Sequence, residues 1–214
     1  GHADGICHCY VDEGANPEMA ARIVVDSKTQ YVAVCNATET LLVHEKAAPG
    51  FLPVLKDALD KKQVALTGCP KAQEIIAVAP ATEADWGTEY LDYKLSVKVV
   101  SDLDEGVSHI NTSGSGHTDS IITGSKDNAA RFMALVDSGN VFWNCSTRFS
   151  DGFRYGFGAE VGISTNKIHA RGPVRLEGLV IYKYTVIGNG HIVAEYSNRV
   201  KTFKHKKMEK DFPF

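Results

Sequence analysis

The alternation of strand-like and helix-like segments along residues 5–144 predicts an α/β fold, with flanking helices and a largely parallel sheet. Three observations support this prediction. Apolar residues recur at helical spacing in some segments, whereas others are short β-prone runs. Capping residues and acidic residues mark the points where helices begin. The connections between successive segments are short.

The chain opens with an extended run, since residues 5–11 have the composition of a strand. Asn16 and Pro17 then supply an N-cap and a first-turn proline. Apolar side chains continue from there at helical spacing as far as Ser27, which predicts the first helix. The run 40–44 is predicted to be the second strand.

Leucines at helical spacing within residues 51–61 predict an amphipathic helix. Two short strands are predicted next, at 64–67 and at 74–78. Apolar and polar side chains alternate within residues 95–100, and this pattern is typical of a strand.

Residues 102–111 open with acidic side chains, which favour the start of a helix. A short β-prone run at 120–123 is predicted as a strand. Residues 127–136 carry apolar side chains at helical spacing, and 141–144 form the last predicted strand of this series.

Glycines cluster after residue 150 and helical periodicity disappears, which is typical of a surface loop that supports a site. A long β-prone run follows, and a Gly-Asn-Gly turn at 188–190 leads into a return strand. A β-hairpin is therefore predicted over 179–200. The domain before it is expected to span 1–178, and the basic residues of 201–214 are expected to form a solvated tail.

The composition excludes several classes of function. The 214 residues have a formal net charge of −3, so no global basic field favours nucleic acid as a partner. No apolar stretch reaches the roughly 18 residues that a membrane span requires. No signal peptide precedes the first strand-like segment.

The cysteines are odd in number and irregularly spaced, which indicates reduced thiols and a cytoplasmic protein. They are Cys7, Cys9, Cys35, Cys69 and Cys145. Cys7 and Cys9 flank His8, but no second ligand pair stands at zinc-finger spacing. Buried thiols are therefore favoured over a metal site, and no metal is expected.

Four segments carry long and specific motifs. They are Gly-His-Ala-Asp-Gly-Ile-Cys-His at 1–8, Ala-Val-Cys-Asn-Ala-Thr-Glu-Thr-Leu-Leu-Val-His at 33–44, Ser-Gly-His-Thr-Asp at 115–119, and the stretch 144–179. Together they cover nearly the whole chain except the tail. They resemble the catalytic half of the gamma-glutamyl phosphate reductases, a family of the aldehyde dehydrogenase superfamily, and the details look similar to fungal forms. The resemblance implies an aldehyde dehydrogenase catalytic-domain fold, with the hairpin as an oligomerisation arm that joins copies of the chain.

The resemblance implies NADPH-dependent reduction of an acyl phosphate to an aldehyde through a thioester, a step of proline biosynthesis. This route needs a thiolate nucleophile, an oxyanion site, a group that binds the phosphate and a hydride donor. Cys35 stands in the place of the nucleophile, and the backbone N–H of Cys35 or Asn36 is a candidate for half of the oxyanion site. Without the resemblance, Cys35 would read as a buried small residue.

Further site residues follow from the same resemblance. The candidates for binding the small-molecule substrate are His117, Ser146, Thr147, Arg148 and Arg171. Glu89 resembles the glutamate that contacts the nicotinamide ribose of the cofactor. The alternative for residues 146–148 is a solvated turn, and the alternative for Glu89 is a surface acid at a helix end.

Members of the family are about twice as long as this chain, and no Gly-x-Gly-x-x-Gly stands between a strand and a helix here. The dinucleotide-binding half is therefore expected to be absent, and NADPH is not expected to be bound by this chain alone. Arg175 replaces a glycine of the family beside the glycine-rich loop. Three hypotheses remain open: a domain of a working reductase, a truncated homologue with non-redox chemistry such as a cyclisation in fungal specialised metabolism, or an assembly partner.

Overall fold

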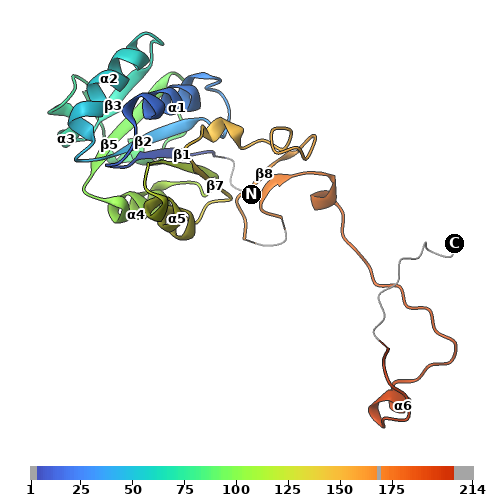
Figure 1. Cartoon of the computed structure of the whole chain (residues 1–214). Coiled ribbons are helices and arrows are strands. Elements are labelled where there is room, and N and C mark those ends of the chain that lie inside the picture. Colours follow the sequence, from blue (N-terminus) through green and yellow to red (C-terminus); the bar gives the residue numbers. More distant parts are fainter. Residues whose placement is uncertain (1–3, 168–169, 205–214) are drawn as a thin grey trace. The chain divides into compact units, whose positions relative to one another are not determined.

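A parallel seven-stranded sheet forms the centre of the computed structural model, which describes residues 4–167 and 170–204 (Figure 1). The strand order is β4-β3-β5-β2-β1-β6-β7, and every pairing between neighbours is parallel. The strands are β1 Cys7–Val11, β2 Thr38–His44, β3 Ala65–Gly68, β4 Ala79–Pro80, β5 Lys94–Val100, β6 Thr118–Ile122 and β7 Asn140–Trp143.

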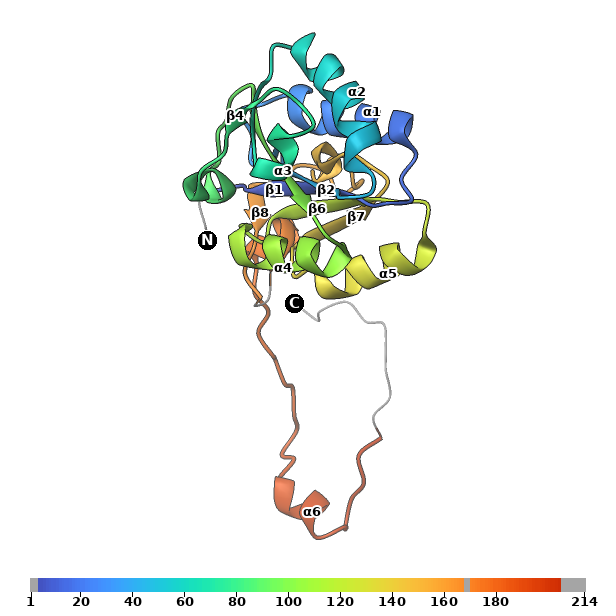
Figure 2. The same cartoon turned by 90° about the vertical axis from the view of Figure 1, so that its left-hand side faces the viewer.

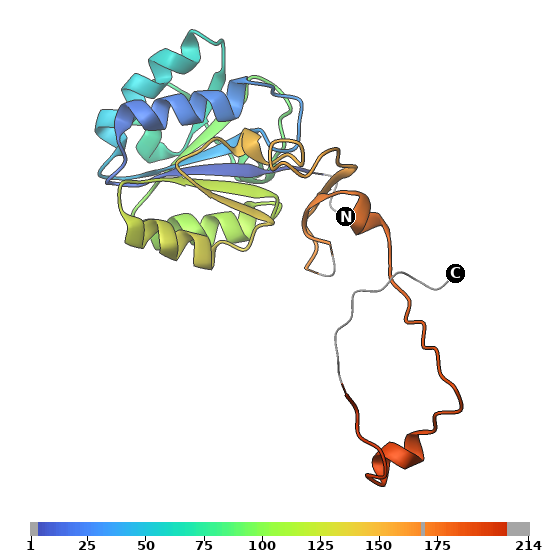
Figure 3. The same cartoon turned by 45° about the vertical axis from the view of Figure 1, so that its right-hand side comes forward.

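Helices cover both faces of this sheet (Figure 2, Figure 3). The main helices are α1 Pro17–Thr29, α2 Ala48–Asp60, α4 Leu103–Ser113 and α5 Lys126–Leu135. Shorter elements are α3 Pro70–Gln73 and the 3-10 turns η1 Glu83–Gly87, η2 Thr147–Phe149 and η3 Leu176–Leu179. Strands β8 Gly162–Ser164 and β9 Gly172–Val174 pair with each other antiparallel.

The two faces of the sheet bury two separate cores. Cys9 and Val11 of β1 pack with α1 and α2, whereas Tyr10 between them packs with α4 and α5. In β2 the same alternation places Leu42 on the face of α4 and α5. Successive side chains of a strand point to opposite faces, so a strand that is covered on both faces reads as an uninterrupted buried run. The predicted α/β fold with a largely parallel sheet is confirmed.

The predicted start of the first helix is also observed. Asn16 is extended, its side chain accepts a hydrogen bond from the Met19 N–H at 2.9 Å, and Pro17 occupies the first turn. The helix ends at Thr29, and a loop connects it to β2, which begins at Thr38.

One predicted strand, at 74–78, is wrong. Pro70 begins the short helix α3 there, and a turn follows it before the two-residue strand β4. Ala72 and Ile76 both pack into the core, and their separation of four residues suits a helical turn rather than a strand. The apolar run was too short for its periodicity to distinguish the two.

The chain divides after Val180 into two units, of which the second begins at Ile181. In the described part of 179–200 the predicted hairpin is absent: the structure has no strand there, and the helix α6 Val193–Ser197 takes the place of the return strand. Two strands with no third element to cover them are marginal in water. Of the predicted basic tail 201–214, the part beyond residue 204 lies outside the described residues.

None of the helices within residues 4–167 and 170–204 combines the length and the apolar character that crossing a membrane demands.

Candidate active site

Cys35 lies in the loop that joins the end of α1 to the start of β2, and its side chain is exposed. Because β1, β2 and β6 are parallel neighbours, their first residues lie close together, at the amino ends of the strands. Cys7 begins β1, and Thr118 begins β6. Most open α/β sheets bind ligands at the carboxyl ends of their strands. The candidate site of this chain lies instead at the amino ends.

The backbone of Cys35 is held from beneath by the segment that leads into β1. The Cys7 thiol donates a hydrogen bond to the Cys35 carbonyl oxygen at 3.2 Å. Gly5 approaches even more closely, because a Cβ at this position would lie 2.0 Å from the same oxygen and 2.4 Å from the Cys35 Cα. Only a glycine leaves room for the Cys35 loop here.

The following residue, Asn36, joins this loop to η2. Its side-chain amide donates to the Ser150 carbonyl at 2.7 Å, and its own carbonyl accepts from the Thr147 hydroxyl at 2.7 Å. The Thr147 hydroxyl also lies 3.1 Å from that of Thr38, and the Thr147 N–H donates to Ser27. The side chain of Asn36 is therefore occupied in holding the loop. Its backbone N–H donates no hydrogen bond to another residue of 4–167 or 170–204.

Ser146 and Thr147 are buried, and their hydroxyl groups are used within the protein. The Ser146 oxygen accepts hydrogen bonds from the Ser27 hydroxyl at 3.1 Å and from the Arg148 N–H at 3.2 Å. These contacts fix the start of η2 against the last turns of α1 and against the Cys35 loop.

Arg148 is 8% exposed and lies beside this loop. Its Nε donates to the Gln30 side chain at 2.9 Å, and its carbonyl accepts from Arg154. Burial and the neighbouring Arg154 lower the pKa of the Arg148 guanidinium. Within the described part of the chain neither of its Nη groups has a hydrogen-bond partner. A buried cation with free donors suits an anionic group of a substrate.

The electrostatic surroundings of Cys35 are mixed. Burial is the largest effect and raises the pKa of the thiol; the Cys35 backbone N–H opposes it by lowering this pKa. The carboxylates of Glu89 and Glu160 raise the pKa further, and Arg148 lowers it. The carboxyl end of α1, where the helix dipole is negative, also points to this edge. The resting side chain therefore keeps its proton at neutral pH.

Glu160 is a site residue that was not singled out from the sequence, although it lies within the motif Gly-Ala-Glu-Val-Gly-Ile-Ser-Thr. Its carboxylate accepts the Gly152 N–H at 2.7 Å, and burial raises its pKa. Glu89 is half-buried and follows η1. The structure thus brings two carboxylates from distant segments to Cys35.

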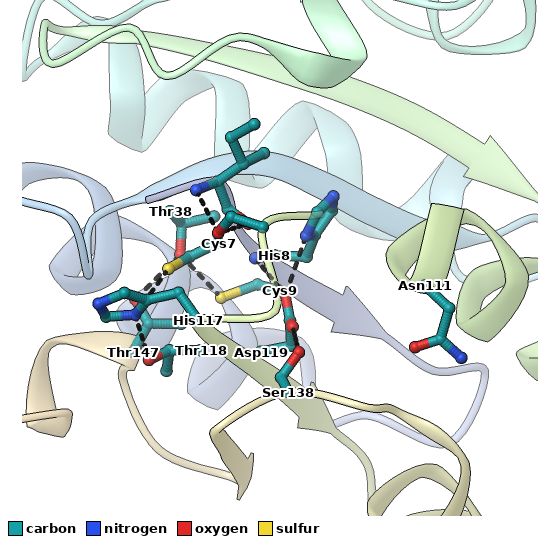
Figure 4. A network of polar contacts seen from close by, with 12 residues as sticks. Cys7, His8, Cys9, Thr38, Asn111, His117, Thr118, Asp119, Ser138 and Thr147 are labelled. Carbon is teal, nitrogen blue, oxygen red and sulfur yellow. Dashed lines mark hydrogen bonds and ion pairs between the residues drawn. The ribbon is translucent and has the colours of Figure 1, made fainter. Parts of the chain in front are cut away.

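His117 contacts Cys7 (Figure 4), and the Cys7 thiol in turn donates to the Cys35 carbonyl. Its Nδ1 lies 2.7 Å from the Thr118 hydroxyl and 3.7 Å from the Cys7 sulfur. The ring is 3% exposed, and burial lowers its pKa to about 4, so the ring is neutral. Its Nε2 is buried and has no hydrogen-bond partner in the described part of the chain.

A second buried network in Figure 4 connects β1 to β6 without reaching Cys35. The His8 Nδ1 lies 2.9 Å from an Asp119 carboxylate oxygen, which also accepts the His8 N–H at 2.8 Å. Ser138 donates to the other oxygen of Asp119. We assign this network to the sheet rather than to the site.

Arg171 is placed differently from the other candidates. Its guanidinium donates to a carboxylate oxygen of Asp137 at 2.9 Å and to the Asp137 carbonyl at 3.0 Å. Lys167 pairs with the same carboxylate. Unlike Arg148, Arg171 is not among the charges that shift the pKa of Cys35.

No group of three or more metal-ligating side chains occurs among residues 4–167 and 170–204.

No family model matches the chain. It is 76% identical to the gamma-glutamyl phosphate reductase of Acetivibrio thermocellus over 213 residues, which is 100% of this chain and 49% of that protein. It is 74% identical to the reductase of the same name from Pelotomaculum thermopropionicum, covering 99% of this chain and 49% of that protein. The chain thus spans about half the length of these relatives.

Solved structures agree with this result. The gamma-glutamyl phosphate reductase of Thermotoga maritima superposes with a TM-score of 0.86 at 48% identity, over 89% of this chain and 46% of that one. An acetylating aldehyde dehydrogenase of Geobacillus thermoglucosidasius, at 16% identity, has a TM-score of 0.63 over 88% of this chain and 53% of that one, and shows the shared fold.

The expected likeness to fungal forms is not supported. The yeast reductase from Saccharomyces cerevisiae is 34% identical with a TM-score of 0.54, over 73% of this chain and 40% of that one, whereas the more similar relatives above are bacterial. The chain has the α/β fold of the aldehyde dehydrogenases and matches, along its whole length, about half of a bacterial gamma-glutamyl phosphate reductase.

Proposed function

We propose that the chain is the thiol-bearing half of an enzyme that reduces gamma-glutamyl phosphate to glutamate 5-semialdehyde in proline biosynthesis. One observation carries the proposal: the exposed thiol of Cys35 sits on a loop whose Cys35 and Asn36 carbonyl groups are both held by hydrogen bonds. Arg148, whose charge acts on this thiol, has no hydrogen-bond partner for its Nη groups among the described residues. The 76% identity to a reductase favours this function over the non-redox and assembly alternatives.

In the first step the Cys35 sulfur loses its proton and attacks the acyl carbon of the acyl phosphate. The carbon–sulfur bond forms and the bond to the phosphate oxygen breaks, so inorganic phosphate leaves together with the thiol proton and a thioester remains. We assign half of the oxyanion site to the backbone N–H of Cys35 or Asn36. Arg148 binds an anionic group of the substrate and favours the thiolate.

NADPH, when bound, would supply a hydride to the thioester carbonyl. The Cys35 sulfur would then be the leaving group: it would take back the electron pair of the carbon–sulfur bond as the aldehyde is released. Ser146 and Thr147 hold the loop in place during both steps, because their hydroxyl groups already bind the protein. We assign His117 and Arg171 to the surroundings of the substrate, His117 through its contact with Cys7 and Arg171 through its ion pair with Asp137.

The cofactor fits only in part. Glu89, half-buried beside Cys35, is placed to accept hydrogen bonds from a ribose. The sequence contains no glycine-rich cradle between a strand and a helix for the phosphates. We expect NADPH to bind this chain weakly. Titration calorimetry measures this directly, and micromolar affinity for the chain by itself would overturn the expectation.

The segment after Val180 supports self-association. Its apolar side chains are exposed, with Ile181 and Val186 each 91% accessible. The strand β7 lies at an edge of the sheet and offers unpaired backbone groups. We propose a homo-oligomer in which this segment pairs with a second copy. Light scattering should show a monomer for Ile181→Lys/Val186→Lys and an oligomer for the control Lys183→Ala; a monomeric wild-type chain contradicts the proposal.

All five cysteines are free, which fits a reducing compartment, and we propose the cytoplasm.

The central proposal is tested by acylation. Freshly made gamma-glutamyl phosphate is mixed with the chain, and the peptide that carries Cys35 is followed by mass spectrometry. A thioester on Cys35 that is lost in Cys35→Ser is the expected result. Equal acylation of Cys145, which is also partly accessible, indicates non-specific chemistry and refutes the assignment.

A further inference from the structure

A buried ion pair lies at the base of the Cys35 loop. Lys28, in the last turn of α1, and Glu39, in β2, are both 0% exposed, and their charged atoms lie 2.6 Å apart. The two residues flank the loop in sequence, so the pair closes it at both ends.

The stability of the fold does not by itself explain why two charged side chains are buried here. Taking two charges out of water is costly, and apolar residues of similar volume often serve a core equally well. Burial raises the pKa of Glu39 to about 7 although Lys28 opposes this, and burial lowers the pKa of Lys28. The second carboxylate oxygen of Glu39 is buried and has no hydrogen-bond partner among the described residues. A core optimised for stability alone would not retain such a group.

The pair also reaches a third segment, the turn that follows Glu89. The backbone N–H groups of Leu91 and Tyr90 lower the pKa of Glu39, although among the described residues only Lys28 makes a hydrogen bond to its carboxylate. The Lys28 ammonium lies over the Tyr90 ring, 6.0 Å from its centre. Leu91 has a φ of 52°, in the left-handed region, which a branched apolar residue rarely adopts. A strained residue persists where its surroundings hold it in place.

Among the described residues, neither Lys28 nor Glu39 makes a hydrogen bond to Cys35. The largest influences on the pKa of Cys35 come from its own burial and from other charged groups. Both interact instead with Cys7, whose thiol donates to the Cys35 carbonyl. The pair therefore acts on the backbone around Cys35 and not on its sulfur.

We propose that Lys28 and Glu39 form a positioning pair that fixes the Cys35 loop and the Glu89 turn relative to each other. The inference rests on the proposed function, in which the thioester at Cys35 must face the nicotinamide beside Glu89. A displacement of about 1 Å between reacting groups can reduce a rate by about a hundredfold. A rigid connection between the two segments is thus a requirement of the chemistry.

The test replaces the pair in the full chain by Lys28→Met/Glu39→Leu, because removing one partner alone leaves a buried charge. The matched control is Lys46→Met/Glu13→Leu, which removes an ion pair of 2.7 Å whose side chains are 68% and 45% exposed. Lys28→Arg is the conservative variant. Hydrogen exchange followed by mass spectrometry reports on peptides that cover 31–37 and 88–92, with β6 as the internal reference.

We expect exchange in both peptides to become about tenfold faster in Lys28→Met/Glu39→Leu, with β6 unchanged and with the control and Lys28→Arg near wild type. Acylation of Cys35 at saturating gamma-glutamyl phosphate should fall by about tenfold or more, while the concentration for half-saturation changes little. If the double variant does not fold, Lys28→Gln/Glu39→Gln, which keeps two polar side chains and leaves no buried charge, is measured in the same way.

Unchanged exchange in a folded variant overturns the inference, and so does faster exchange in only one of the two peptides, because the pair would then not connect them. A wild-type chain that is not acylated at Cys35 contradicts the proposed function instead. The exchange result still decides the positioning role in that case, since it requires no activity.

Discussion

The close approach of Gly5 to the nucleophile gives the sharpest prediction. In Gly5→Ala the added Cβ would lie 2.0 Å from the Cys35 carbonyl oxygen and 2.5 Å from its carbonyl carbon. Both contacts are with backbone, so no side-chain rotation relieves them. Non-bonded carbon atoms ordinarily keep about 3.5 Å apart, and the two segments must therefore separate by roughly 1 Å or more.

This separation has two consequences. It pulls the Cys35 carbonyl away from the Cys7 thiol, whose hydrogen bond is now 3.2 Å long. It also shifts the sulfur relative to Arg148 and the backbone donors, and a shift of about 1 Å costs about a hundredfold in rate. Overpacking of this kind also destabilises a fold by about 1–3 kcal/mol.

The assay is the rate of Cys35 acylation by gamma-glutamyl phosphate, measured together with thermal unfolding. The matched control is Gly14→Ala, because a Cβ at Gly14 meets nothing within 4 Å. We expect acylation to slow by about a hundredfold in Gly5→Ala and to stay near wild type in Gly14→Ala. A Gly5→Ala protein that acylates Cys35 at the wild-type rate and unfolds at the wild-type temperature would refute the reasoning.

The remaining predictions concern the charge and accessibility of the thiol. Glu160→Gln removes a charge that raises the pKa of Cys35, so iodoacetamide should label Cys35 faster at neutral pH. Arg148→Gln removes a charge that lowers this pKa, so labelling should become slower. A change of the labelling rate in the same direction in both variants would contradict the assignment. Labelling of Cys35 should continue to increase as the pH rises beyond the ordinary thiol pKa; a plateau at neutral pH would show a pre-formed thiolate. Peptide mapping should find Cys35 labelled before Cys7 and Cys9, which are fully buried and whose pKa values burial raises.

The order of helices and strands could be predicted from local patterns, because periodicity and caps are local. Asn16 and Pro17 marked the start of α1 correctly. The strand predicted at 74–78 failed because a short apolar run is compatible with a helical turn. The hairpin over 179–200 failed for another reason, since its strands need a partner that this chain by itself does not supply.

Less of the candidate site than of the fold could be predicted from the sequence. The motif around Cys35 indicated the nucleophile, but the contact between Asn36 and Thr147 joins residues more than a hundred positions apart. Lys28 and Glu39 read as ordinary charges in a helix and beside a strand, and only the tertiary structure shows that they are buried together. Such contacts depend on the assembled sheet rather than on any local pattern.

The protonated state of the resting Cys35 has a consequence for its survival between turnovers. Peroxide oxidises the thiolate and not the thiol, so an exposed cysteine with a low pKa is converted readily to sulfenic and then to irreversible sulfinic acid. Burial holds the pKa of Cys35 above the usual thiol value, although its side chain reaches solvent. The same burial that keeps Cys35 protonated at rest thus protects the sulfur from oxidative damage.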